Sequence, residues 1–96
     1  MKNEIKVLKL VTGEEIITRM TEGLNGSLLL DRPMLVQLKS RDMSGNAVIN
    51  IVHWSFVGNT ENVTLESNCV LAIFKATPDG EKNYLISITN VTYKNE

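Results

Sequence analysis

The chain has 96 residues, the length of one compact domain with a small hydrophobic core. Hydrophobic residues make up 43% of the chain and charged residues 22%, a balance typical of globular proteins that argues against disorder. The 10 Lys and Arg residues nearly balance the 11 Asp and Glu residues, so overall charge does not draw the protein to nucleic acid. A site for RNA would have to gather basic groups locally, for instance by repeating one patch around a ring.

Residue types that usually carry catalysis or bind metals are sparse and scattered. Cys69, the single cysteine, adjoins an apolar run and is expected to be a buried, inert thiol. His53, the single histidine, has no second histidine or cysteine motif near it and is a poor acid–base or metal candidate. Because the sequence also has no phosphate-binding glycine loop and no hydrolase or zinc-protease motif, we expect no enzymatic activity, cofactor or metal.

No part of the sequence predicts secretion or membrane insertion. The first residues, 1–4, lead directly into an alternating pattern and contain no apolar signal segment. No window approaches the roughly 18 apolar residues that a membrane-spanning helix needs. We therefore expect a cytoplasmic protein without a membrane partner.

Alternating apolar and polar residues in the first half of the chain predict strands separated by glycine turns. Residues 5–10 and 15–22 are expected to pair as a hairpin. An Asn-Gly turn follows, and a long strand is expected over about residues 27–40. Since Pro33 cannot donate a hydrogen bond to a ladder, it marks an edge, a bulge or a bend in that strand.

Further short strands are expected in the second half of the chain. Residues 47–57 alternate again, and residues 63–65 predict a short strand. Residues 69–74 form a continuous apolar run, which is typical of a strand covered on both faces. A domain of this size has few elements with which to cover its sheet edges. We therefore expect those edges to pair between subunits and to close a ring.

The segment 77–92 fits either a helix or a final strand. Thr77 and Pro78 are the residue types of a helix start, and apolar residues then recur every three to four positions. Gly80 and several β-branched residues weigh against a helix, and Pro-Asp-Gly would equally suit a hairpin turn. Of the two, we favour the helix.

Two parts of the sequence resemble the two motifs of the Sm family. Residues 7–20 and 31–38 are similar to the first motif, in which a glycine turn joins two strands and Asp-x-x-Met-Asn follows. Residues 63–73 are similar to the second motif, in which a strand ends in Arg-Gly and a short apolar strand follows. The order and spacing of these segments, over residues 5–75, look closest to the small Sm-like proteins of bacteriophages.

The resemblance implies one Sm-like domain over residues 1–96, folded as a strongly bent, five-stranded, SH3-like barrel. It implies that subunits join strand to strand into a ring of about five to seven copies, whose pore binds RNA. The expected function is therefore that of a homo-oligomeric ring that binds single-stranded RNA non-covalently, as an RNA chaperone or RNA-handling protein.

The matching motif positions give the candidate RNA-binding residues, which are Asp31, Arg32, Met34, Ser67 and Asn68. Each has a structural alternative: Asp31 as a turn residue, Met34 as a core residue and Asn68 as a corner residue. Arg32 and Arg41 are the candidate phosphate contacts, or else solvated surface side chains.

Two positions depart from the Sm pattern. Leu35 stands where Asn is expected, and a Leu side chain has no amide with which to read a base edge. Ser67-Asn68 stands in place of Arg-Gly, which removes a charge and a flat stacking surface. These differences leave a second interpretation open, in which the ring keeps the fold but serves as a protein-interaction or assembly scaffold without RNA.

Overall fold

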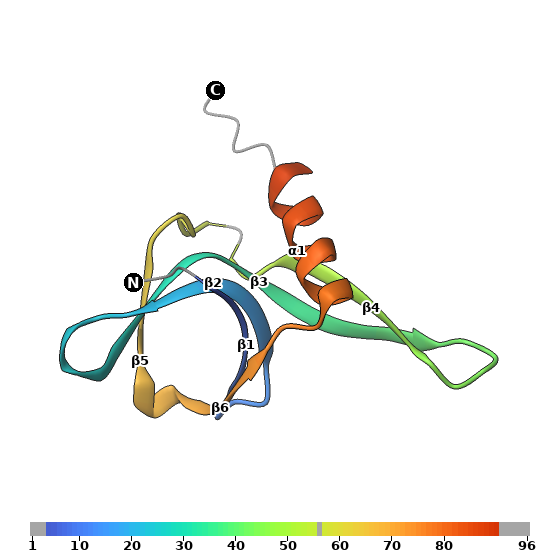
Figure 1. Cartoon of the computed structure of the whole chain (residues 1–96), viewed down its shortest axis with the longest axis horizontal. Coiled ribbons are helices and arrows are strands. Elements are labelled where there is room, and N and C mark those ends of the chain that lie inside the picture. Colours follow the sequence, from blue (N-terminus) through green and yellow to red (C-terminus); the bar gives the residue numbers. More distant parts are fainter. Residues whose placement is uncertain (1–3, 56, 91–96) are drawn as a thin grey trace.

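Figure 1 shows a computed structural model of the chain, which describes residues 4–55 and 57–90. Its strands are β1 (Glu4–Leu10), β2 (Glu15–Glu22), β3 (Ser27–Arg41), β4 (Ala47–His53), β5 (Val63–Glu66) and β6 (Val70–Lys75). Two short 3-10 turns, η1 (Leu24–Gly26) and η2 (Ser67–Cys69), join β2 to β3 and β5 to β6. The helix α1 (Pro78–Asn90) follows β6, so the expected mainly β domain with a C-terminal helix is confirmed.

The strands form one antiparallel sheet with β6 at one margin and with β4 and β5 along the other. Its order is β4-β3-β2-β1-β6, and β5 pairs with the first half of β3. The sheet curls into a roll in which η2 joins β5 to β6 (Figure 1), but the described residues form no ladder between those two strands. The sheet is therefore open and has six strands, unlike the five-stranded barrel that the resemblance implies.

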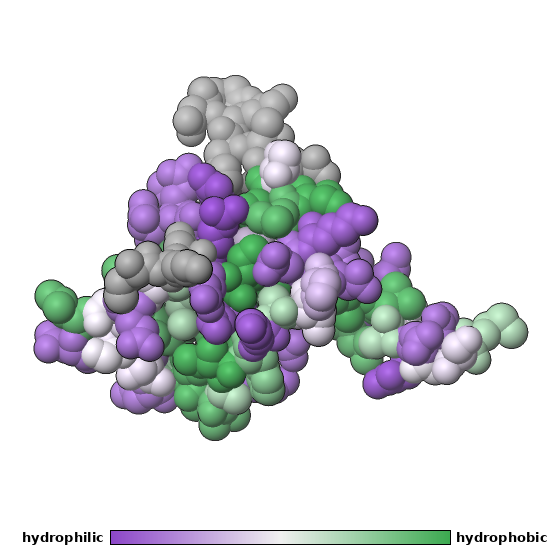
Figure 2. Space-filling view, in the orientation of Figure 1, coloured by the Kyte–Doolittle hydropathy of each residue, from purple (hydrophilic) through white to green (hydrophobic). Residues whose placement is uncertain are grey.

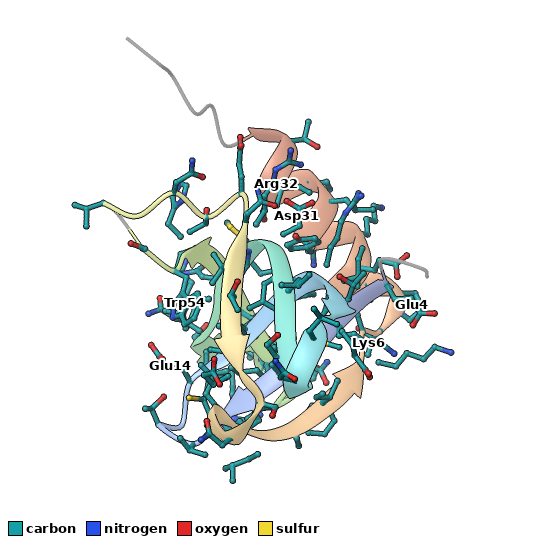
Figure 3. All side chains as sticks on the ribbon, turned by 90° about the vertical axis from the view of Figure 1, so that its left-hand side faces the viewer. Glu4, Lys6, Glu14, Asp31, Arg32 and Trp54 are labelled. Atoms are coloured by element: carbon teal, nitrogen blue, oxygen red, sulfur yellow. The ribbon has the colours of Figure 1, made fainter. Side chains whose placement is uncertain are left out.

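Two apolar clusters lie on the two faces of this sheet. The larger fills the inside of the roll and includes Leu8, Ile16 and Leu30, with half-buried Trp54 packed against it (Figure 3). The smaller lies between the outer face and α1. Ile16 and Ile17 contribute to different clusters because successive side chains of a strand point to opposite faces.

The helix α1 begins where the sequence predicts it. The Thr77 side-chain oxygen accepts a hydrogen bond from the Gly80 backbone N–H at 3.0 Å, which is a standard N-terminal cap. Proline at the first helical position needs no such partner. The helical alternative for residues 77–92 is confirmed up to residue 90, and residues 91 and 92 lie outside the described part of the chain.

A bulge bends β3 at the position of its proline. Ile17 pairs with Met34 and Arg19 pairs with Asp31, so Arg32 and Pro33 together lie opposite one residue of β2. The Arg32 backbone has a φ of 54°, in the left-handed region that residues other than glycine seldom adopt. The bend allows β3 to pair with β5 through its first half and with β4 through its second half.

Tyr84 of α1 holds the backbone of this bulge. Its hydroxyl lies 2.8 Å from the Asp31 carbonyl oxygen and 2.9 Å from that of Arg32, and donates its one proton towards them. The Arg19 backbone N–H donates to the same hydroxyl at 3.3 Å. Tyr84 is fully buried, and the Asp31 carbonyl oxygen also accepts a hydrogen bond from the Thr18 hydroxyl at 3.2 Å, so protein groups and not water hold this backbone. We call this arrangement the Tyr84 clamp.

The strand β6 departs from its predicted environment. Its side chains Leu71, Ile73 and Phe74 are 67%, 47% and 50% exposed, so the strand is not covered on both faces within one chain. The prediction of two-sided coverage is therefore wrong for the single subunit. The apolar pattern of the strand exceeds what the described residues of one copy can bury.

Tyr84→Phe removes the hydroxyl of the clamp and keeps the aromatic ring. We expect the free energy of unfolding to fall by about 1–3 kcal/mol, because buried backbone groups lose a hydrogen-bond partner. Urea denaturation followed by circular dichroism measures this change. Thr89→Val is the control, since it removes an exposed hydroxyl bonded only within α1, and should cost less than about 0.5 kcal/mol. Equal costs for the two variants would rule out the clamp.

Candidate functional site

Two turns that are distant in the sequence meet at one end of the roll. The register pairs Ser27, which follows η1, with Glu66, which precedes η2. A Cβ atom at Gly26 would lie 3.5 Å from the Ser67 side-chain oxygen, so the two turns are in near contact. We call residues 24–26 and 67–69 the loop cluster.

The sequence of η1 explains its tight turn. Asn25 and Gly26 have φ values of 60° and 77°, which asparagine and glycine adopt at the lowest cost. The Ser27 hydroxyl donates to the Leu24 carbonyl oxygen at 2.8 Å and fixes the turn from within. The Asn-Gly signal therefore predicts this turn correctly, although it gives no indication that η2 lies beside it.

The loop cluster presents polar groups without positive charge. Asn25, Ser67 and Asn68 are exposed, and their amides and hydroxyls are able to pair with nucleic-acid base edges. Glu22 and Glu66 are exposed at the strand ends that lead into the cluster. The cluster itself contains no Lys or Arg, so the local charge favours contacts to bases over contacts to phosphates.

The RNA-binding residues predicted from the sequence do not lie together in the structure. Ser67 and Asn68 belong to the loop cluster, whereas Asp31 and Arg32 lie in the bulge beside α1 (Figure 3). At about 3.3 Å per residue, Asp31 is roughly 13 Å along β3 from the cluster. Met34 is 2% exposed and belongs to the cluster beneath α1, which confirms its alternative as a core residue.

Sequence reasoning missed Leu24 and Asn25 as residues of this site. Leu24 is 86% exposed, and Asn25 lies at the tip of the same turn. The Asn-Gly pair identifies a turn, but only the pairing of β3 with β5 places it beside η2. Cys69, expected to be buried, is instead half-buried, and its thiol lies 3.6 Å from the Asn68 amide oxygen.

An open groove of about 390 Å³ runs over the outer face of the sheet beside the start of α1. Its apolar lining includes Ile49 of β4 and Phe74 of β6, so it extends between the two margins. In residues 4–55 and 57–90, no group of His, Cys, Asp and Glu side chains gathers in a way that would hold a metal ion. The described helices also include none with the length and apolar character to cross a membrane.

Two cations and one anion lie at the bulge, because Arg19 is directly opposite Asp31 in the ladder and Arg32 follows Asp31 in the chain. The Arg32 Nε atom lies 3.7 Å from an Asp31 carboxylate oxygen, and both side chains are partly exposed. Burial raises the pKa of the neighbouring Tyr84 hydroxyl, while the hydrogen bond from the Arg19 backbone N–H acts in the opposite direction. The Tyr84 clamp is therefore built on the neutral form of the phenol.

The raised pKa of Tyr84 predicts a loss of stability at alkaline pH. The folded protein holds the phenol proton more tightly than the unfolded chain, whose pKa is about 10.0. The resulting stabilisation is fully present below that pH and is lost as the pH rises through the folded pKa. Urea denaturation from about pH 8 to 11 should show wild type losing more stability than Tyr84→Phe. Parallel pH profiles for the two proteins would contradict this role.

Comparison with known proteins does not assign this chain to a family. No protein-family model matches the sequence, and no curated protein matches it. The Sm-like resemblance therefore depends on the two motif segments, their order and their spacing.

Proposed function

We propose that this chain is the subunit of an Sm-like homo-oligomeric ring that pairs its sheet margins and binds single-stranded RNA. The observation that carries the proposal is that β4 and β6, which lie on opposite margins of the described sheet, both display exposed apolar side chains. A free edge with this composition promotes uncontrolled pairing unless another chain completes it. Ring closure satisfies every such edge at once.

The composition of β6 supports pairing with another copy. Ile73 pairs with Leu8 and Phe74 pairs with Val7, so the exposed side chains of β6 project from both faces of the sheet. A strand inside a sheet has this pattern, and a strand at a solvated margin does not. A neighbouring strand would bury Leu71, Ile73 and Phe74 more deeply than the single chain does.

The second half of the β3–β4 hairpin supports the same conclusion. Its side chains Leu38, Val48 and Ile49 are 58%, 39% and 42% exposed, and the hairpin extends beyond the body of the molecule (Figure 1). Figure 2 shows apolar surface where this hairpin leaves the body. Two strands alone are marginally stable in water, so a contact with a neighbour would stabilise them.

The two margins differ in sequence, which favours a ring over a two-fold dimer. The β4 strand has 7 residues and β6 has 6, so a ladder between them can run their whole length. A contact between unlike margins is head-to-tail, and successive head-to-tail contacts close when the rotation per subunit allows it. The apolar groove between Ile49 and Phe74 lies beside both margins and adds surface that a neighbour would cover.

RNA binding is the function proposed for the loop cluster. A ring repeats the amides of Asn25 and Asn68 and the hydroxyl of Ser67 once in every subunit. Such groups suit the edges of unstacked bases in single-stranded RNA. Arg32, partly exposed in the bulge, is the proposed phosphate contact.

The charge of the loop cluster favours a second candidate function. Glu22 and Glu66 flank the cluster, and repeating them around a ring would repel phosphates. A ring of this kind would act as a protein-interaction or assembly scaffold without RNA. The two functions share the assembly and differ only in the ligand.

Ile73→Lys tests the assembly. Light scattering after gel filtration should give wild type a mass several times the 10.7 kDa of one chain, and a charge at the β6 margin should reduce that mass. Ile86→Lys is the matched control, because Ile86 on α1 is 48% exposed, as Ile73 is at 47%. A monomeric wild type at micromolar concentration, or equal masses for both variants, would overturn the proposed interface.

Filter binding with U-rich and A-rich RNA separates the two candidate functions. The RNA function predicts binding that weakens steeply as salt rises, and a further loss of about tenfold in Arg32→Ala or Asn68→Ala. Both residues are at least partly exposed, so the variants should fold as wild type does. Binding no stronger than that of an unrelated control protein at low salt would leave the scaffold as the function.

A further inference from the structure

The turn between β3 and β4 forms a second exposed site. Residues 39–46, which we call the arm tip, are all exposed. They lie at the right-hand end of the molecule in Figure 1, on the opposite side from η1 and β5. Any ligand of the arm tip would therefore bind away from the loop cluster of the same subunit.

The arm tip is the centre of a basic part of the chain. From Arg32 to Thr60 the sequence contains a single acidic residue, Asp42, although the whole chain has 11. Lys39 and Arg41 are both exposed on the arm tip. Elsewhere Lys6 pairs with Glu4 at 3.0 Å, and Lys9 lies directly opposite Glu15 in the ladder. The positive charges of the arm tip therefore have fewer acidic neighbours than Lys6 and Lys9 have.

The one acid of the arm tip is turned inward. An Asp42 carboxylate oxygen accepts hydrogen bonds from the backbone N–H groups of Ser44 and Asn46, both at 2.9 Å. The Arg41 guanidinium donates through Nη1 to the Gly45 carbonyl oxygen at 3.1 Å, and keeps its other N–H groups for a ligand. These bonds fix the turn and direct the acidic group towards its own backbone.

Met43 projects from the end of this fixed turn. Its side chain is fully exposed and is therefore accessible to a ligand. Flexible apolar side chains of this kind insert between or against nucleic-acid bases. A basic pair beside one exposed apolar residue, among small polar residues, matches a phosphodiester chain better than an apolar protein surface.

We propose that the arm tip is a second RNA contact, in which Lys39 and Arg41 bind phosphates and Met43 lies against a base. The proposal rests on the proposed RNA-binding ring and adds a site outside its loop cluster. Each subunit contributes two cations here, so the ring carries a repeated positive patch where phosphates are not opposed by Glu22 and Glu66. The backbone of the RNA is then held mainly by the arm tips, and the loop cluster contributes base contacts.

The test compares two double variants of the full chain that each remove two positive charges. Lys39→Gln with Arg41→Gln alters the arm tip, and Lys9→Gln with Lys82→Gln is the charge-matched control. Fluorescence anisotropy with labelled oligouridylate and oligoadenylate measures affinity over a range of salt concentrations. The arm variant should bind at least tenfold more weakly, and its salt dependence should be shallower by about 0.7 for each phosphate that it no longer neutralises.

The outcomes distinguish this proposal from the function on which it depends. If the arm and control variants weaken RNA binding equally, general charge is responsible and the arm contact is overturned. If the arm variant binds as wild type does while Asn68→Ala does not, RNA binding stands and the arm contact fails. If the wild-type protein binds no RNA, both proposals are overturned. If the arm variant forms a smaller oligomer, the arm tip contacts a neighbouring protein subunit and not RNA.

Discussion

The Tyr84 clamp is the interaction on which the rest of the structure depends. A bulge removes backbone groups of β3 from the ladder, and such groups are costly to bury without partners. The hydroxyl of Tyr84 supplies a partner for two carbonyl oxygens and one N–H group at this point. The helix α1 is therefore part of the sheet's hydrogen bonding as well as a cover for its outer face.

The bend that the clamp stabilises divides the subunit into two halves. The first half of β3 leads from η1 and pairs with β5, which places the loop cluster at one end. The second half pairs with β4 and extends into the arm tip at the other. Charge is divided in the same way, because Glu22 and Glu66 flank the loop cluster while Lys39 and Arg41 lie on the arm. Binding to bases and binding to phosphates are thereby proposed for separate ends of one strand.

Local patterns in the sequence predict the elements well and their tertiary neighbours poorly. Thr77 and Pro78 predict the start of α1, and Pro33 predicts an edge, a bulge or a bend, because capping and the missing proline N–H act within a few residues. Asp31 and Ser67 are predicted as residues of one RNA site, but the strand register places Asp31 roughly 13 Å from the loop cluster. The prediction that β6 is covered on both faces fails for another reason. The apolar run of β6 indicates burial on both sides, but the described residues of one subunit leave both sides partly exposed.

The left-handed backbone of Arg32 constrains what evolution can place at that position. Glycine adopts this conformation freely, whereas arginine pays about 1–2 kcal/mol for it, and the proline that follows favours extended backbone at this position instead. Backbone geometry alone would select for glycine or asparagine here. Exchange of Arg32 for glycine would therefore relieve the backbone and remove the partly exposed guanidinium beside Asp31.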